Sequence, residues 1–137
     1  MSILPISRAI PIVKAAILAA LAPLVDLDKE GLPSVYWEQA TPARVYPCIV
    51  FQSQDNGGKA ESTIGGRGWS GLFAIKVYAL TPDDVDALLP EIELAMASAS
   101  AADGYDLTVL ECYPLTLPSG DTTAAGGLIF RISVYLQ

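Results

Sequence analysis

The sequence contains no histidine and only two cysteines, and these absences limit its chemistry. Histidine is the commonest general base, nucleophile partner and metal ligand near neutral pH, so most catalytic arrangements lose a member without it. Cys48 and Cys112 lack CxxC spacing, and we interpret both as small buried hydrophobic residues in a reducing compartment. We therefore expect no catalytic, cofactor-binding or metal-binding residues, and a protein that is not an enzyme.

Phosphate-binding signatures are missing as well. The stretch "GGKAEST" (57–63) departs from the GxxxxGK[ST] frame, because Ala60 follows Lys59 and Ser53 stands where the first glycine belongs. The stretch "GGRGWSG" (65–71) has no GxGxxG spacing and precedes an expected strand instead of a helix. Neither segment predicts a nucleotide site.

Basic residues are scarce, with eight Lys and Arg against fifteen Asp and Glu and a net charge of −7. No basic residue lies between Lys76 and Arg131, whereas nine carboxylates do. Such a segment repels phosphate, which disfavours binding to nucleic acids or anionic membranes. It is interpreted first as a solvated acidic face, and secondly as the border of a channel through which DNA passes without sticking. The candidates for such a lining are Asp83, Asp84, Asp86, Glu91 and Glu93.

The sequence has no uninterrupted apolar run long enough to cross a bilayer. Its most apolar stretch, "IPIVKAAILAALAPLVD" (10–26), is interrupted by Lys14 and two prolines. It resembles a signal peptide only in its Ala-Leu-Ala, so we expect a core helix in its place. With 137 residues and 52% hydrophobic composition, the chain is expected to form a single domain over residues 1–137.

Two helices are expected. The first begins near Ser7 and ends before Pro23, with an apolar stripe built on Ile12, Ala15, Ala16, Ala19 and Ala20 and widened by Ile17, Leu18 and Leu21. The second begins at "TPDD" (81–84), where threonine caps, proline takes the first position and aspartates complement the helix dipole. Its expected apolar face is Val85, Leu88, Leu89, Ile92 and Met96, and Pro90 predicts a kink.

Strands are expected at residues 35–37, 46–54, 69–80, 105–116 and 128–137. In the last of these, every second residue is apolar and the residues between them include polar ones. This period of two is typical of a half-buried strand. The order α-β-β-β-α-β-β predicts an α+β fold, with a mainly antiparallel sheet of four to five strands and two helices on one face.

A long glycine-rich loop joins two of these strands. Residues 46–54 and 69–80 are expected to pair as an antiparallel hairpin, whose loop at about residues 55–68 far exceeds the usual ~2–5 residues. A loop of this length, if it has a role, is typical of an arm that orders on a partner. The residues proposed for partner contact are Asp55, Gly57, Gly58, Lys59, Glu61, Arg67 and Trp69.

The order of elements resembles that of the tail terminator, or tail completion, proteins of long-tailed bacteriophages. The resemblance rests on the Ala- and Leu-rich first helix, "YPCIV" (46–50), the glycine-bearing hairpin, "VDALLPEIELAM" (85–96) and "FRISVYL" (130–136). It covers nearly the whole chain but is one of pattern, without a diagnostic motif.

The resemblance implies a structural virion protein, assembled in the bacterial host cytoplasm and placed at the head-proximal end of the tail. Such proteins form a homo-oligomeric ring, usually a hexamer, which stops polymerisation of the major tail tube protein and joins the tail to head-tail connector proteins. It further implies that the hairpin loop contacts the tube or an adjacent subunit, that DNA passes through the ring without specific binding, and that no membrane is involved.

Two alternatives stay open. The chain could be a head-tail connector or head-closure protein, which forms rings at the same junction. It could instead be a small-molecule-binding α+β regulatory module with a ligand at the sheet edge. A closed ring in solution would argue against the second alternative.

Overall fold

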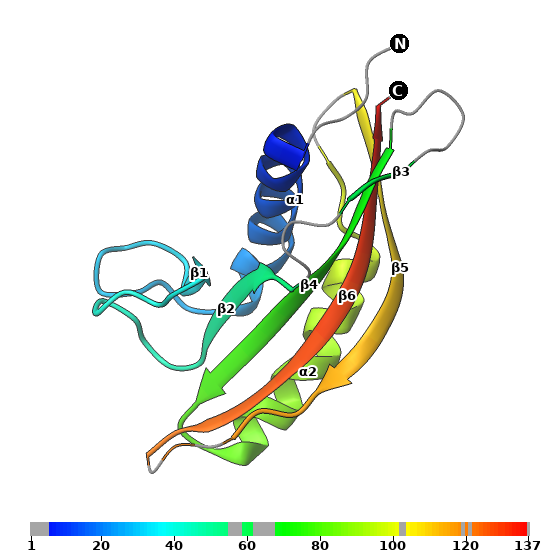
Figure 1. The fold of residues 1–137 in the computed structure, drawn as a ribbon. Helices are drawn as coiled ribbons and strands as arrows, with labels where there is room; N and C mark the ends of the chain where they lie inside the picture. Colours follow the sequence, from blue (N-terminus) through cyan, green and yellow to red (C-terminus); the bar gives the residue numbers. More distant parts are fainter. Residues whose placement is uncertain are drawn as a thin grey trace.

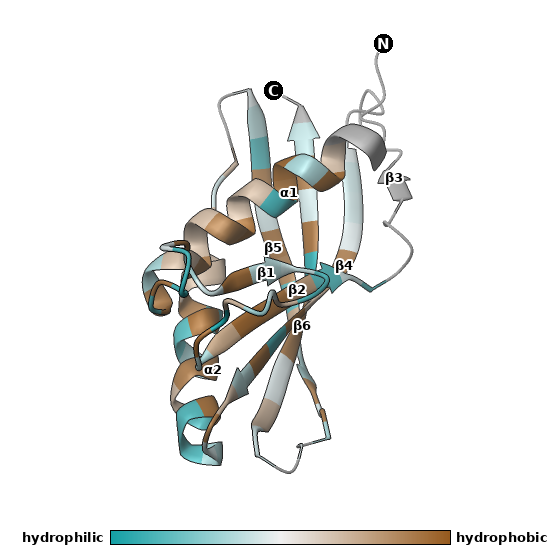
Figure 2. Ribbon diagram, turned by 90° about the vertical axis from the view of Figure 1, so that its left-hand side faces the viewer, coloured by the Kyte–Doolittle hydropathy of each residue, from teal (hydrophilic) through white to brown (hydrophobic). Residues whose placement is uncertain are grey.

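The computed structural model of the protein describes residues 6–54, 59–61, 68–101, 104–118, 120 and 122–136. Two helices form one layer and a sheet forms the other, with both helices on the same face of the sheet (Figures 1 and 2). This arrangement confirms the predicted α+β class. The elements are α1 (Ile6–Leu21), the 3-10 turn η1 (Ala22–Leu24), β1 (Val35–Trp37), β2 (Cys48–Ser53), β3 (Lys59–Glu61), β4 (Gly68–Ala79), α2 (Pro82–Ala97), β5 (Tyr105–Leu115) and β6 (Ala124–Leu136).

The sheet follows the order β1-β2-β4-β6-β5, with the short β3 paired to β4. Strands β2 and β4 form the predicted antiparallel hairpin, in which Cys48 lies opposite Tyr78. Strand β1 runs parallel to β2, so the sheet is mixed and not purely antiparallel. The connection between β1 and β2, residues 38–47, therefore has to cross from one end of the sheet to the other.

The core lies between the helices and the inner face of the sheet. Large aromatic side chains fill its centre, and Phe51, Trp69, Phe73 and Phe130 are all buried. Helix α2 contributes the predicted face, with Val85, Leu88, Ile92 and Met96 buried and Leu89 packed against them. Thr81 caps this helix as predicted, because its Oγ1 accepts a hydrogen bond of 3.2 Å from the Asp84 backbone N–H.

The predicted apolar stripe of α1 was right in Ala16, Ile17 and Leu21 and wrong in Ala15 and Ala19. The buried residues are Ala9, Val13, Ala16, Ile17 and Leu21, whereas Ala15 and Ala19 are exposed. Both stripes have helical spacing, but burying Val13, Ile17 and Leu21 removes more apolar surface from water than burying alanines does. Side-chain size, rather than periodicity, fixes which face of α1 meets the sheet.

Two predictions for the C-terminal half need correction. The segment 124–127, expected to be part of a turn, is the beginning of β6, and Gly126 lies directly beneath Val85 of α2. Cys112, expected to be buried, is exposed. It lies on β5, the edge strand, where the pairing register shifts between Val109 and Glu111 and only one neighbouring strand covers the chain.

Candidate functional site

The described residues contain no cluster of metal-binding side chains, since no three His, Cys, Asp or Glu among them are grouped so that they could hold a metal ion. None of the described helices combines the length and apolarity that crossing a membrane requires. The candidate sites are therefore surfaces: an acidic helix, the hairpin end of the sheet, and the sheet face opposite the helices.

Helix α2 gathers the five carboxylates that were proposed to line a channel. Asp83, Asp84, Asp86, Glu91 and Glu93 are all exposed, and the helix contains no basic residue. Asp83 and Asp84 occupy the first turn, where they also stabilise the helix through its dipole. The structure thus brings these residues together on one helix, with the opposite side of that helix in the core.

The hairpin residues proposed for partner contact are only partly covered by the structure. Asp55, Gly57, Gly58 and Arg67 lie outside the described residues. Lys59 and Glu61 belong to β3, where their backbones lie opposite Ser70 and Gly68 of β4. A strand of three residues therefore stands within the segment expected to be a continuous loop.

Trp69 has a different environment from the one expected. Its side chain is fully buried and makes an edge-on contact with Phe73, the ring centroids being 5.8 Å apart. On β4 it faces the helix layer, as Phe73 and Ile75 do. In the described arrangement Trp69 is a core residue of the subunit, not a residue of a contact surface.

The outer face of the sheet carries a mixture of apolar and polar side chains. The pairing register places Cys48, Val50, Ala74, Lys76 and Tyr78 on this side of β2 and β4. Further along the sheet, Arg131 of β6 and Glu111 of β5 approach to 3.5 Å between Nε and Oε2, and the Tyr113 hydroxyl donates to the same carboxylate oxygen. Neither of the two described helices covers this side (Figure 2).

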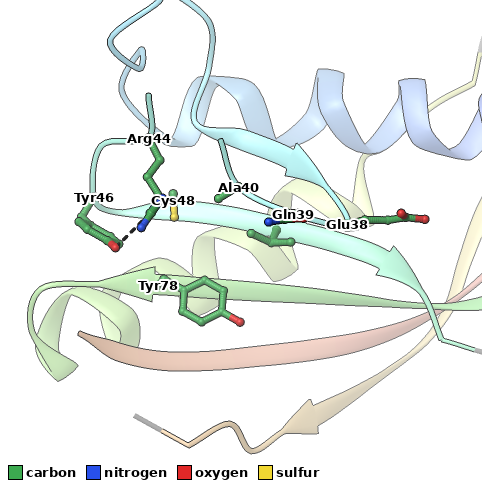
Figure 3. Close-up of a pocket in the computed structure, with 8 residues that line it drawn as sticks. Glu38, Gln39, Ala40, Arg44, Tyr46, Cys48 and Tyr78 are labelled. Carbon is green, nitrogen blue, oxygen red and sulfur yellow. Dashed lines mark hydrogen bonds between the residues drawn. The ribbon is translucent and has the colours of Figure 1, made fainter. Parts of the chain in front are cut away.

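One part of the outer face is hollowed. The connection between β1 and β2 borders an open hollow of about 360 Å³ there. Figure 3 shows Arg44 and Tyr46 at one end and Tyr78 below. The lining residues are Glu38, Gln39, Ala40, Arg44, Tyr46, Cys48, Val50 and Tyr78.

Arg44 is held in position at the rim of this hollow. Its Nε donates to the Tyr46 hydroxyl at 3.2 Å, and its Nη1 donates to the Thr41 carbonyl oxygen at 3.2 Å. The guanidinium carbon also lies 5.8 Å from the centroid of the Tyr46 ring, within the range of a cation–π contact. The hydrogen bond to Tyr46 raises the pKa of Arg44 above its ordinary, already high value, so the guanidinium stays charged.

The floor of the hollow is uncharged. Burial raises the pKa of the Cys48 thiol, although the nearby Arg44 charge acts in the opposite direction, and burial likewise raises the pKa of Tyr78. Sequence reasoning assigned no role to the connection "EQATPARVYP" (38–47). The sequence feature that could have indicated this site is an arginine two residues before a tyrosine, in a loop between strands.

Comparisons with known proteins bear on the fold alone. No family model matches the chain, and no curated protein sequence matches it. A solved structure of 15% sequence identity matches 93% of this chain and 94% of its own, with a TM-score of 0.58. At this identity the match supports the α+β fold and carries no information about function.

Proposed function

We propose that the protein is a tail terminator of a long-tailed bacteriophage, a structural protein that forms a homo-oligomeric ring on the head-proximal end of the tail tube. The ring would stop polymerisation of the major tail tube protein and present the surface that head-tail connector proteins join. A hexamer is the expected stoichiometry. The protein would act in the virion after assembly in the host cytoplasm.

The observation that carries this proposal is the extension of β4 and β6 beyond the end of β2. Strand β2 ends at Ser53, opposite Phe73, whereas β4 continues to Gly68 alongside β6. Strand β3 pairs with this extension (Figure 1). A pair of long strands that continues past β2 and holds a further strand supports the role of an arm that reaches a neighbouring protein.

The negative charge of α2 also supports this proposal. A ring through which DNA passes must not bind phosphate, and an exposed helix bearing five carboxylates repels it. The channel lining is thus proposed to be α2.

The first test is the native mass of the purified protein, alone and after mixing with tail tubes. A closed ring near six subunits is expected, either in solution or on the tube end. A protein that stays monomeric and leaves tubes free to elongate would contradict the proposal. A ring that binds portal-side head proteins but not tubes would favour the connector alternative instead.

The second test deletes residues 57–66. The subunit should stay folded, because the deletion lies between β2 and β4 and leaves both strands intact; of the described elements it removes β3 alone. Capping of tubes should be lost. A matched control replaces the same residues with a Gly-Ser segment of equal length, which separates the contribution of the side chains from that of loop length. Normal capping by the deletion variant would show that the loop assignment is wrong.

A further inference from the structure

We propose that the hollow beneath the 38–47 connection is a binding site for a carboxylate carried on an apolar or aromatic stem, with Arg44 as the group that recognises the carboxylate. The inference rests on the outer face of β2 and β4 and goes beyond the proposed function, which does not use this site. The carboxylate could belong to a free small acid or to the C-terminus of a protein.

The first step of the argument is the size and chemistry of the hollow. A volume of about 360 Å³ falls within the usual range of small-ligand sites, roughly 300–1,000 Å³. Such sites combine an apolar floor with a few polar groups that fix orientation. Here the floor includes Cys48 and Val50, which are 1% and 6% exposed, and Tyr78 lies opposite Cys48 in the pairing of β2 with β4.

The second step is the state of Arg44. Guanidinium groups carry five N–H donors, and the two contacts to Tyr46 and Thr41 occupy Nε and Nη1. Within the described part of the chain, no carboxylate forms an ion pair with Arg44. The other arginine of this sheet face, Arg131, is already paired with Glu111. Arg44 is thus a positioned cation with donors to spare, which is the arrangement that recognises a carboxylate.

The third step is the charge of the residues that line the hollow. Glu38 is the one carboxylate that lines the hollow, and Figure 3 places it at the end away from Arg44, with its oxygens pointing outward. Cys48 and Tyr78 are neutral because burial raises the pKa of each. A ligand with its anion at Arg44 and its apolar part over Val50 would meet no charge of its own sign at the Arg44 end.

The experiment titrates the full-length protein with 3-phenylpropionate and with its neutral analogue 3-phenylpropanamide, by calorimetry and by NMR. The acid should bind with a Kd on the order of 1 mM, as expected for so small a ligand, and should shift the signals of Val50 and Tyr78. The amide should bind at least about tenfold more weakly, because the charge-assisted hydrogen bonds are lost.

The variants decide whether Arg44 is responsible. Arg44→Gln should weaken binding of the acid at least about tenfold. The matched control Arg131→Gln removes an arginine from the same sheet face and should leave the Kd unchanged. Arg44 is exposed, so unfolding of its variant should follow that of the wild type. Equal binding of acid and amide, no binding of either, or an Arg44→Gln variant that binds normally would each overturn the inference.

A last arm separates the two sources of the carboxylate. Acetyl-Ala-Phe with a free C-terminus is compared with the same dipeptide amidated. If the free dipeptide binds at least about tenfold more tightly than 3-phenylpropionate, and the amidated one does not, the site recognises a protein C-terminus. If 3-phenylpropionate binds as well as the dipeptide or better, the site recognises a free small acid. Both results support a carboxylate site.

Discussion

At the scale of single residues, Asp28 illustrates how one buried carboxylate organises a loop. Its Oδ1 accepts hydrogen bonds from the backbone N–H groups of Glu30 and Leu32, and its Oδ2 accepts one of 2.8 Å from the Tyr36 hydroxyl. These bonds, led by the one from Tyr36, lower the pKa of Asp28 from its ordinary value of 3.8. The carboxylate form is therefore favoured in the folded state.

This pKa predicts a pH-dependent effect of Tyr36→Phe. A lowered folded-state pKa stabilises the protein above pH 3.8, and this stabilisation is lost as the pH falls through the folded-state value. Tyr36→Phe should therefore lower the urea midpoint near neutral pH, and the difference from wild type should shrink below pH 3.8. Tyr46→Phe is the control, because its partner Arg44 does not titrate in this range. A pH-independent difference for Tyr36→Phe would contradict this account.

The two cysteines predict a simple difference in reactivity. Cys48 is buried and Cys112 is exposed, so one thiol per chain should react with a thiol reagent in the native state and two after unfolding. Partial burial and the charge of Glu93 raise the pKa of Cys112. The midpoint of the rise in its labelling rate with pH should therefore lie above that of an ordinary free thiol, about 8.5. Mass spectrometry of the labelled peptides identifies the residue. Labelling of Cys48 in the folded protein would contradict the described covering of its side chain on the outer face by the 38–47 connection.

At the scale of elements, β6 requires glycine at two adjacent positions, one beneath α2 and one against the neighbouring strands β4 and β5. A Cβ on Gly126 would lie 2.7 Å from Cγ1 of Val85, and a Cβ on Gly127 would lie 2.8 Å from the Ile75 carbonyl oxygen. Gly126→Ala and Gly127→Ala should each destabilise the fold, by roughly 1–3 kcal/mol. Denaturant unfolding measures both.

The two clashes differ in what can relieve them. Val85→Ala removes the side chain that Gly126→Ala would meet, so the double variant should be more stable than the sum of the single effects predicts. The same second substitution should not help Gly127→Ala, whose obstacle is backbone. If Val85→Ala adds independently to Gly126→Ala, as it should to Gly127→Ala, then α2 lies further from β6 than described.

At the scale of the whole molecule, the charge of α2 should govern how the assembly treats DNA. Reversing Asp86, Glu91 and Glu93 to lysine changes the net charge from −7 to −1 and puts cations on an exposed helix face. The subunit should stay within about 0.5 kcal/mol of wild type, since all three side chains are exposed. Under the proposed function, phage particles that carry this variant should eject DNA more slowly.

A variant with the same charge change elsewhere is the control. Asp26, Glu30 and Glu38 are exposed carboxylates outside α2, and their reversal to lysine should leave ejection unchanged. If both triple variants eject DNA at the wild-type rate, α2 does not border the channel. If both slow it equally, the total charge and not the helix is responsible.

The sequence by itself determined the features that depend on neighbours in the chain. The Thr81 cap, the apolar face of α2 and the pairing of β2 with β4 follow from local chemistry and periodicity, and with them the α+β class. Those signals act over a few residues, so a single sequence displays them fully.

The tertiary structure decided what depends on residues that are far apart in the sequence. The burial of Trp69, the exposure of Cys112 and the parallel pairing of β1 with β2 arise because long-range packing, not local pattern, assigns each strand its neighbours and its edge. The hollow at Arg44 exists for the same reason, since the 38–47 connection has to cross the outer face to enter β2 alongside β1.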